Sequence, residues 1–184
     1  QFYPSEVELD SLASNESLPD LNLSDLGFET SGIAQPEYRF DDTLIDQYEA
    51  TRNFPALDQT SRLGAHLRFG TVSIRRLVNQ ASSRSNNTFL KELIWREFFM
   101  QILWHFPYTQ QKSFKPQYER IIWRNNPDEF EKWCAGETGY PLVDAGMREL
   151  NETGFMHNRV RMLVGSFLCK HLLIDWRWGE SYFA

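Results

Sequence analysis

The sequence of 184 residues predicts an all-α fold. Apolar residues recur at helical spacing in successive segments beyond residue 55, and no segment alternates apolar and polar residues with a period of two for long. Aromatic residues make up 15% of the chain, so it can bury a core without metals or disulfides. We therefore expect a multi-helical domain preceded by an irregular acidic linker.

Charge divides the chain into two parts. Residues 1–50 hold 12 acidic side chains and one basic one, Arg39, whereas residues 51–184 hold 13 acidic and 18 basic ones. Residues 1–34 mix Ser, Asp, Glu, Asn and Pro with isolated Leu and keep no period, which is typical of a linker. We expect an irregular acidic arm over 1–47 and a helical domain over 48–184, whose excess of bases is compatible with a polyanionic partner.

Composition and spacing also exclude some classes of protein. The longest apolar runs, such as 163–169, are far shorter than the roughly 18 residues that a membrane span needs, so no membrane partner is expected. Cys134 and Cys169 lack any metal-ligand spacing. They are expected to be free, buried thiols in a reducing compartment, which predicts a cytoplasmic protein without a bound metal.

The first three helices are expected between residues 36 and 103. A weak pattern over 36–50 should end before Pro55, because the residue before a proline is pushed out of the helical region. A second helix begins after 70–73, where a Thr or Ser can cap it. A third and stronger helix follows the polar run 82–88. Its apolar stripe consists of Leu90, Leu93, Ile94, Phe98, Ile102 and Leu103.

The later helices have clearer boundaries. The run Asn126-Pro127-Asp128-Glu129 offers an N-cap, a proline at the first position and acids in the first turn, with Gly136 as terminator. Helices over about 142–154 and 160–172 follow. The core face of the last one is expected to contain Val160, Leu163, Val164, Phe167, Leu168 and Leu172. All six tryptophans are expected in the core.

No common catalytic signature is present: GxGxxG, GxxxxGK[ST], HExxH and GxSxG are all missing. An enzyme of this sequence therefore needs a cofactor to carry its chemistry. One candidate site is the run Thr60-Ser61-Arg62, with Tyr48 and Arg52 upstream. Two hydroxyls and a guanidinium beside a turn can hold phosphate oxygens. The alternative is that Thr60 and Ser61 only cap a helix.

Two further constellations lie on helices. Helical spacing puts Glu92, Trp95 and Arg96 on one side, where they can bind a planar base by hydrogen bonds and stacking. The alternative is a surface ion pair between Glu92 and Arg96 beside a half-buried Trp. The run 156–162 puts Asn158 and Met162 on a face away from the core, with Arg159 and Arg161 available for phosphates. Its His157 is expected to be structural.

Six segments carry a family resemblance: 48–55 (YEATRNFP), 60–70 (TSRLGAHLRFG), 92–98 (ELIWREF), 138–148 (TGYPLVDAGMR), 154–162 (GFMHNRVRM) and 172–183 (LLIDWRWGESYF). In this order they resemble the flavin-binding helical domain of the photolyase and cryptochrome superfamily, class I DNA photolyases in particular. The resemblance covers 48–184 nearly continuously. It implies an FAD cofactor, UV-damaged DNA as partner, and light-driven repair of cyclobutane pyrimidine dimers, in which excited reduced FAD lends the dimer an electron.

The resemblance also implies roles for individual residues. FAD and its phosphates would be held by Tyr48, Thr60, Ser61, Arg62, Leu63, Gly64, Phe89, Arg96, Asn158 and Arg161. The flipped-out dimer and its flanking phosphates would contact Arg52, Glu92, Trp95, Arg96, Asn158, Arg159 and Met162. Glu92 and Asn158 are the expected catalytic residues, together with Trp123 and Trp176 as the outer and middle members of an electron-transfer chain. Gly64 and Phe89 depart from the Ser and Trp that are usual in the family.

Two departures concern the extent of the chain. The family's N-terminal α/β antenna domain is missing, and the sequence ends before the family's Asp- and Asn-rich flavin loop and innermost tryptophan. Residues 48–184 are thus expected to be a partial FAD-binding domain that binds FAD weakly or not at all. Two alternatives stay open: a cryptochrome-type blue-light receptor, and a flavin-free helical DNA-binding module.

Overall fold

The computed structural model describes residues 21–30 and 37–184. The predicted arm therefore lies partly outside the described residues, at 1–20 and 31–36. The described part is helical and contains no strand, which confirms the predicted all-α class. The α-helices are α1 (Asp42–Thr51), α2 (Gly64–Phe69), α3 (Ile74–Ser82), α4 (Thr88–His105), α5 (Pro127–Ala135), α6 (Pro141–Thr153), α7 (Asn158–Lys170) and α8 (Trp176–Phe183). The short 3₁₀ helices are η2 (Leu23–Leu26), η3 (Pro107–Gln110) and η4 (Pro116–Arg120).

Helices α1 to α4 form a first lobe with its own core. Asp41 caps α1 by accepting a hydrogen bond from the backbone N–H of Leu44 at 2.8 Å, and Ser73 caps α3. The loop before α4 is tied to α1 by Arg84, which pairs with Asp42 and Asp46. The buried core contains Leu44, Ile45, Leu63, Leu77, Ala81, Phe89 and Leu93.

Helices α5 to α8 form a second lobe around a separate core. The expected boundaries of α5 are confirmed, since Asn126 accepts from the backbone N–H of Glu129 and Gly136 ends the helix in the left-handed conformation. Asp175 caps α8, a helix that the periodicity does not predict. The buried core contains Trp133, Val143, Met147, Met156, Val160, Val164, Phe167, Leu168 and Ile174.

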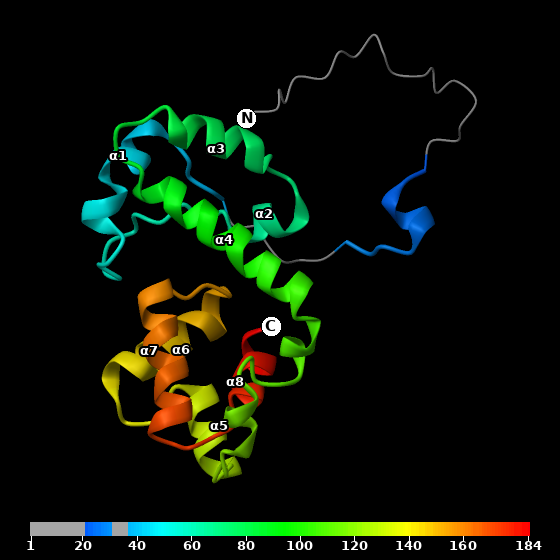
Figure 1. The fold of residues 1–184 in the computed structure, drawn as a ribbon, viewed down its shortest axis with the longest axis vertical. Helices are drawn as coiled ribbons and strands as arrows, with labels where there is room; N and C mark the ends of the chain where they lie inside the picture. Colours follow the sequence, from blue (N-terminus) through cyan, green and yellow to red (C-terminus); the bar gives the residue numbers. More distant parts are fainter. Residues whose placement is uncertain (1–20, 31–36) are drawn as a thin grey trace.

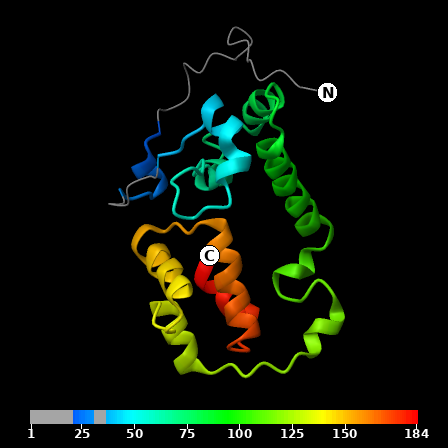
Figure 2. The same ribbon diagram turned by 90° about the vertical axis from the view of Figure 1, so that its left-hand side faces the viewer.

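The long helix α4 leads from the first lobe toward the second (Figure 1). After it the chain passes through η3 and η4 to α5, and α7 returns toward the first lobe with its N-terminal end (Figure 2). Arg177 at the start of α8 holds the η3–η4 segment in place by pairing with Glu119 and donating to the Gln111 carbonyl. The two lobes meet where α1 ends and α7 begins, since Arg159 on α7 donates a hydrogen bond to Asn53 just after α1.

Several expectations about the core are wrong. Of the six tryptophans only Trp133 is buried, and Trp104 is 81% exposed. On α4 the first-lobe helices cover only the N-terminal turns. Of the predicted stripe only Leu93 is buried, together with Phe89 outside it, and the other stripe residues are half-buried or exposed. Leu163 on α7 is exposed. The cysteines are free but half-buried, and burial raises the pKa of Cys134 to about 11.

Candidate functional site

Three helices bring predicted site residues to the junction between the lobes. Arg52 is the C-cap residue of α1, and its Nη1 lies 2.5 Å from Oε1 of Glu92 on α4. From the second lobe, Nε of Arg159 on α7 donates to Oδ1 of Asn53 at 2.8 Å. The alternative pair of Glu92 with Arg96 is wrong, because the Arg96 guanidinium donates instead to the Leu67 carbonyl at 3.3 Å. The junction therefore gathers two guanidinium groups and one carboxylate.

Tyr48 lies beside this charge cluster. Its ring packs edge-on against Phe89 at 5.0 Å between centroids, and the Arg52 guanidinium lies 5.5 Å from its centroid. Burial raises the pKa of the Tyr48 phenol, and the negative charge of Glu92 adds to that effect. The phenol is therefore neutral at physiological pH and keeps its O–H as a donor.

The start of α7 is organised by His157. This residue is buried, with 5% of its surface exposed, and its Nδ1 accepts a hydrogen bond from the backbone N–H of Arg159 at 3.1 Å. The expectation of a structural histidine is confirmed. One turn further, Sδ of Met162 accepts from Arg159 Nη1 at 3.5 Å and lies 3.8 Å from Nδ2 of Asn158. Asn158 and Met162 are exposed and lie on the same face of α7, one turn apart.

The predicted phosphate cradle forms a polar hollow in the first lobe. Thr60 and Arg62 line a cavity of about 310 Å³ together with Arg39 and Asp58. Arg62 has a positive φ of 53°, pairs with Asp58 at 3.1 Å and lies over the ring of Phe155. The helix-cap alternative is wrong, because Leu63 occupies the N-cap position of α2 and makes no side-chain cap bond.

Two predicted cofactor residues have side chains that are already packed. Leu63 and Phe89 are buried in the first-lobe core, so neither side chain has room to contact a bound molecule. Any contact from Leu63 would therefore use its backbone. Gly64, in contrast, is exposed at the first position of α2 and has open space around its Cα.

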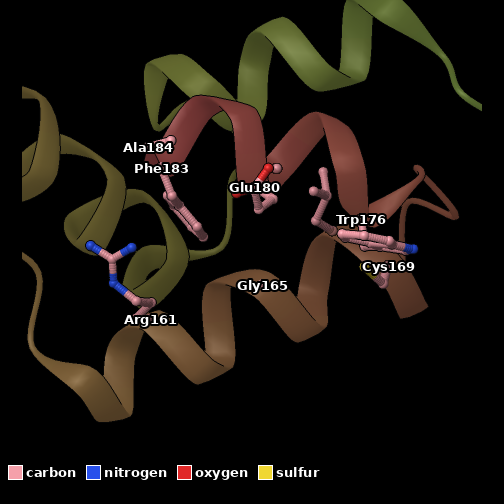
Figure 3. Close-up of a pocket in the computed structure, with 9 residues that line it drawn as sticks. Arg161, Gly165, Cys169, Trp176, Glu180, Phe183 and Ala184 are labelled. Carbon is pink, nitrogen blue, oxygen red and sulfur yellow. The ribbon is translucent and has the colours of Figure 1, made fainter. Parts of the chain in front are cut away.

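A second hollow lies between α7 and α8. Figure 3 shows Arg161 and Phe183 near one end of it and Cys169 and Trp176 near the other. The cavity has a volume of about 480 Å³, and the Arg161 guanidinium lies 4.7 Å from the centroid of the Phe183 ring. It thus joins a predicted flavin contact, Arg161, to a predicted electron carrier, Trp176.

The remaining predicted residues lie outside these contacts. Trp123 is half-buried in the segment before α5, where the backbone N–H of its neighbour Arg124 donates to the Leu173 carbonyl. Trp95 is 54% exposed and packs against Phe98 and Phe99 on the uncovered side of α4. The structure therefore does not bring Trp95 into contact with the cluster around Glu92.

Sequence reasoning missed the residues that join the lobes. Asn53 lies two residues before the predicted helix stop at Pro55, and its bond to Arg159 spans 106 positions. Pairing across that separation has no local signal in a single sequence. In the described ranges no group of three or more His, Cys, Asp or Glu is placed to hold a metal ion. The helices of that part are also too short or too polar to cross a membrane.

Comparison with known proteins gives consistent matches. Residues 89–184 match the family described as the FAD binding domain of DNA photolyase. The chain is 43% identical over 157 residues to the deoxyribodipyrimidine photo-lyase of Neurospora crassa, covering 79% of this chain and 26% of that protein. It is 42% identical over 164 residues to that of Escherichia coli, covering 84% of this chain and 34% of that protein.

Solved structures agree with these sequence matches. A bacterial class III photolyase from Agrobacterium tumefaciens superposes with a TM-score of 0.73 at 46% identity, over 77% of this chain and 32% of that one. A cryptochrome from Synechocystis gives a TM-score of 0.70 at 38% identity, over 77% and 31%. The chain spans about a third or less of the length of these relatives.

Proposed function

The chain belongs to the family of FAD-binding domains of DNA photolyases, and from this membership we propose that the protein uses light and reduced FAD to split cyclobutane pyrimidine dimers in DNA. The activity is that of the whole protein that carries these helices. The observation that supports the proposal most directly is the junction between the lobes. There the Arg52–Glu92 pair lies near Arg159, a cation whose partner is neutral.

The residues present suit FAD by their chemistry. Hydroxyl groups of Thr60 and Ser61 and the Arg62 guanidinium are donors for phosphate oxygens. The three residues follow one another just before α2, and Thr60 and Arg62 line a polar cavity. Asn158 and Arg161 supply an amide and a guanidinium for the polar edge of a flavin ring. Held by these residues, FAD would supply the light-driven one-electron chemistry that the side chains themselves lack.

The junction suits a damaged pyrimidine pair. A dimer stacked in a duplex cannot approach a cofactor inside the protein, so it has to leave the helix. Arg159 can then hold a flanking phosphate, since its neutral partner leaves its charge uncompensated. The Glu92 carboxylate accepts hydrogen bonds only, which matches the ring N–H of a pyrimidine. Met162 offers an apolar thioether to the dimer.

The proposal further assigns Trp176 and Trp123 to electron supply. Trp176 borders the cavity that also contains Arg161, and Trp123 lies in the segment hydrogen-bonded to the loop before α8. An indole at each of these places can be oxidised and reduced again. The Arg177 guanidinium lies 4.7 Å from the centroid of the Trp176 ring. Its positive charge favours the uncharged indole over the oxidised one, so it favours the return of an electron to Trp176.

The test is lesion binding and repair by the protein expressed from its intact gene. An oligonucleotide with one cyclobutane thymine dimer is compared with an undamaged oligonucleotide of the same sequence. Binding is measured in the dark by fluorescence anisotropy, and repair is then measured under blue light. We expect Glu92→Gln to weaken dimer binding by about tenfold, because a charged acceptor is lost. Glu97→Gln is the matched control, since Glu97 lies on the same helix and bonds only to Gln101 among the described residues.

Three outcomes would contradict the proposal. A wild-type protein that binds damaged and undamaged DNA equally, with a steep dependence on salt, would be a DNA-binding module without lesion recognition. A flavoprotein that responds to blue light but does not bind the dimer would be a receptor of the cryptochrome kind. Equal effects of Glu92→Gln and Glu97→Gln would remove Glu92 from the lesion site.

A further inference from the structure

We propose that Asn53 and His157 form a latch between the lobes and act as positioning residues for Arg159. The latch consists of the Asn53–Arg159 hydrogen bond and of the buried His157 ring, whose Nδ1 caps the N-terminus of α7 beside the end of α1. It deepens the proposed function, on which its consequence for DNA rests.

Asn53 orients a cation without neutralising it. Its Oδ1 accepts from Nε of Arg159 at 2.8 Å, and Arg159 makes no ion pair with any described residue. Arg52, in contrast, is paired with a carboxylate, and so are Arg84 and Arg177. A neutral amide fixes the plane of the guanidinium while its full charge stays available to a phosphate.

His157 lies at the same place. Its Nδ1 accepts from the backbone N–H of Arg159 at 3.1 Å, and the buried ring lies near the backbone of Arg52. A neutral imidazole has one donor and one acceptor nitrogen. The acceptor role of Nδ1 therefore places the proton of the neutral ring on Nε2. The ring thus holds the N-terminus of α7 next to the C-cap of α1.

The latch matters because the lobes have separate cores. No residue belongs to both buried clusters, and the helix pairs with extensive contact lie within a lobe or between α4 and η3. The position of Arg159 relative to the Arg52–Glu92 pair therefore depends on a few polar contacts. Besides the latch, these include the Arg62 guanidinium over the Phe155 ring at 5.0 Å. Lobes joined by so little are free to shift when one contact is lost.

The first experiment measures dimer affinity of the protein expressed from its intact gene. We expect Asn53→Ala to weaken binding of the dimer oligonucleotide about five- to tenfold, the effect of losing one ordering hydrogen bond to a charged group. Asn53→Asp keeps the acceptor but pairs Arg159 with a negative charge, so it should also weaken dimer binding, and wild-type affinity of this variant would show that the neutrality of the partner does not matter. Asn151→Ala is the matched control, because it removes an amide contact to the Cys134 carbonyl inside the second lobe.

A double-mutant cycle separates positioning from a general loss of structure. If Asn53 acts through Arg159, the variant Asn53→Ala, Arg159→Ala binds the dimer as Arg159→Ala alone does. Additive losses would overturn the proposal, and so would wild-type affinity of Asn53→Ala. A wild-type protein without lesion preference would instead contradict the proposed function.

A second readout does not depend on DNA. In ¹⁵N NMR spectra of the free protein, the Arg159 Nε–H signal should be protected from solvent exchange in the wild type and lose that protection in Asn53→Ala. The His157 ring should show an unprotonated Nδ1 and a protonated Nε2. An exchanging Nε–H in the wild type, or a proton on Nδ1, would overturn the latch.

Discussion

At the scale of single residues, His157 carries the clearest dependence on pH. Burial lowers its pKa below the ordinary value of 6.5, and Arg159 adds to this effect while Glu149 on α6 opposes it. The unfolded chain therefore takes up a proton at a higher pH than the native protein does. The stability that depends on the neutral ring is complete above about pH 6.5 and is lost as the pH falls through the lowered native pKa.

This dependence can be measured by urea unfolding between pH 7.5 and 5.5. We expect the free energy of unfolding of the wild type to decrease over this interval, and to decrease less in His157→Gln, which cannot titrate. His105→Gln is the control, since His105 is exposed at the end of α4. If His157→Gln and the wild type lose stability equally, the titration of His157 does not contribute.

At the scale of elements, the contact between α6 and α7 depends on Gly146. A Cβ at this position would lie 2.4 Å from Cγ1 of Val160 and 3.2 Å from Cγ2 of Val164. Both neighbours are β-branched and buried, so their side chains have few other rotamers. The close approach of the two helices is what holds the start of α7, with Asn158 and Arg159, at the edge of the second lobe.

The expected cost of Gly146→Ala is about 1–3 kcal/mol of unfolding free energy, because overpacking outweighs the better helix propensity of alanine. Gly165→Ala is a matched control in α7, where an added Cβ meets nothing within 4 Å. That variant should be neutral or slightly more stable. Denaturant unfolding measures the free energy of unfolding of both variants, and equal values would contradict the packing argument.

At the scale of the whole molecule, two small cores take the place of one large core. Leu77 is buried in the first and Met147 in the second, with 1% and 0% of their surfaces exposed. Because the two clusters share no residue, a cavity in one lobe should loosen that lobe more than the other. The junction that carries the proposed lesion site lies between these two units, which we expect to open separately.

Native-state hydrogen exchange tests this organisation. Leu77→Ala should lower the opening free energy of amides in α1, α3 and α4 by about 2–5 kcal/mol and leave those of α6 and α7 nearly unchanged. Met147→Ala should do the reverse. Equal losses of protection in both lobes for either variant would mean that the molecule opens as a single cooperative unit.

Much of the fold could be predicted because its signals are local. Local signals include the N-cap Asn126, Gly136 at the end of α5 and Pro55 shortly after α1. Each acts on its own neighbours in the chain, so a single sequence shows it. The buried face of α4 could not be predicted in the same way. Its apolar residues are periodic, but which of them are buried depends on how far the other helices extend along it.

The same distinction between local signals and long-range packing applies to the candidate site. By itself, the sequence determined the helical class, most helix boundaries and the residue types at the site, since these depend on near neighbours and on motif identity. Only the tertiary structure decided that Glu92 pairs with Arg52 rather than with Arg96, that Asn53 holds Arg159, and that Phe89 belongs to the core. The physical reason is distance along the chain: these contacts join residues 40 and 106 positions apart, and only the packing of helices within and between the lobes brings them together.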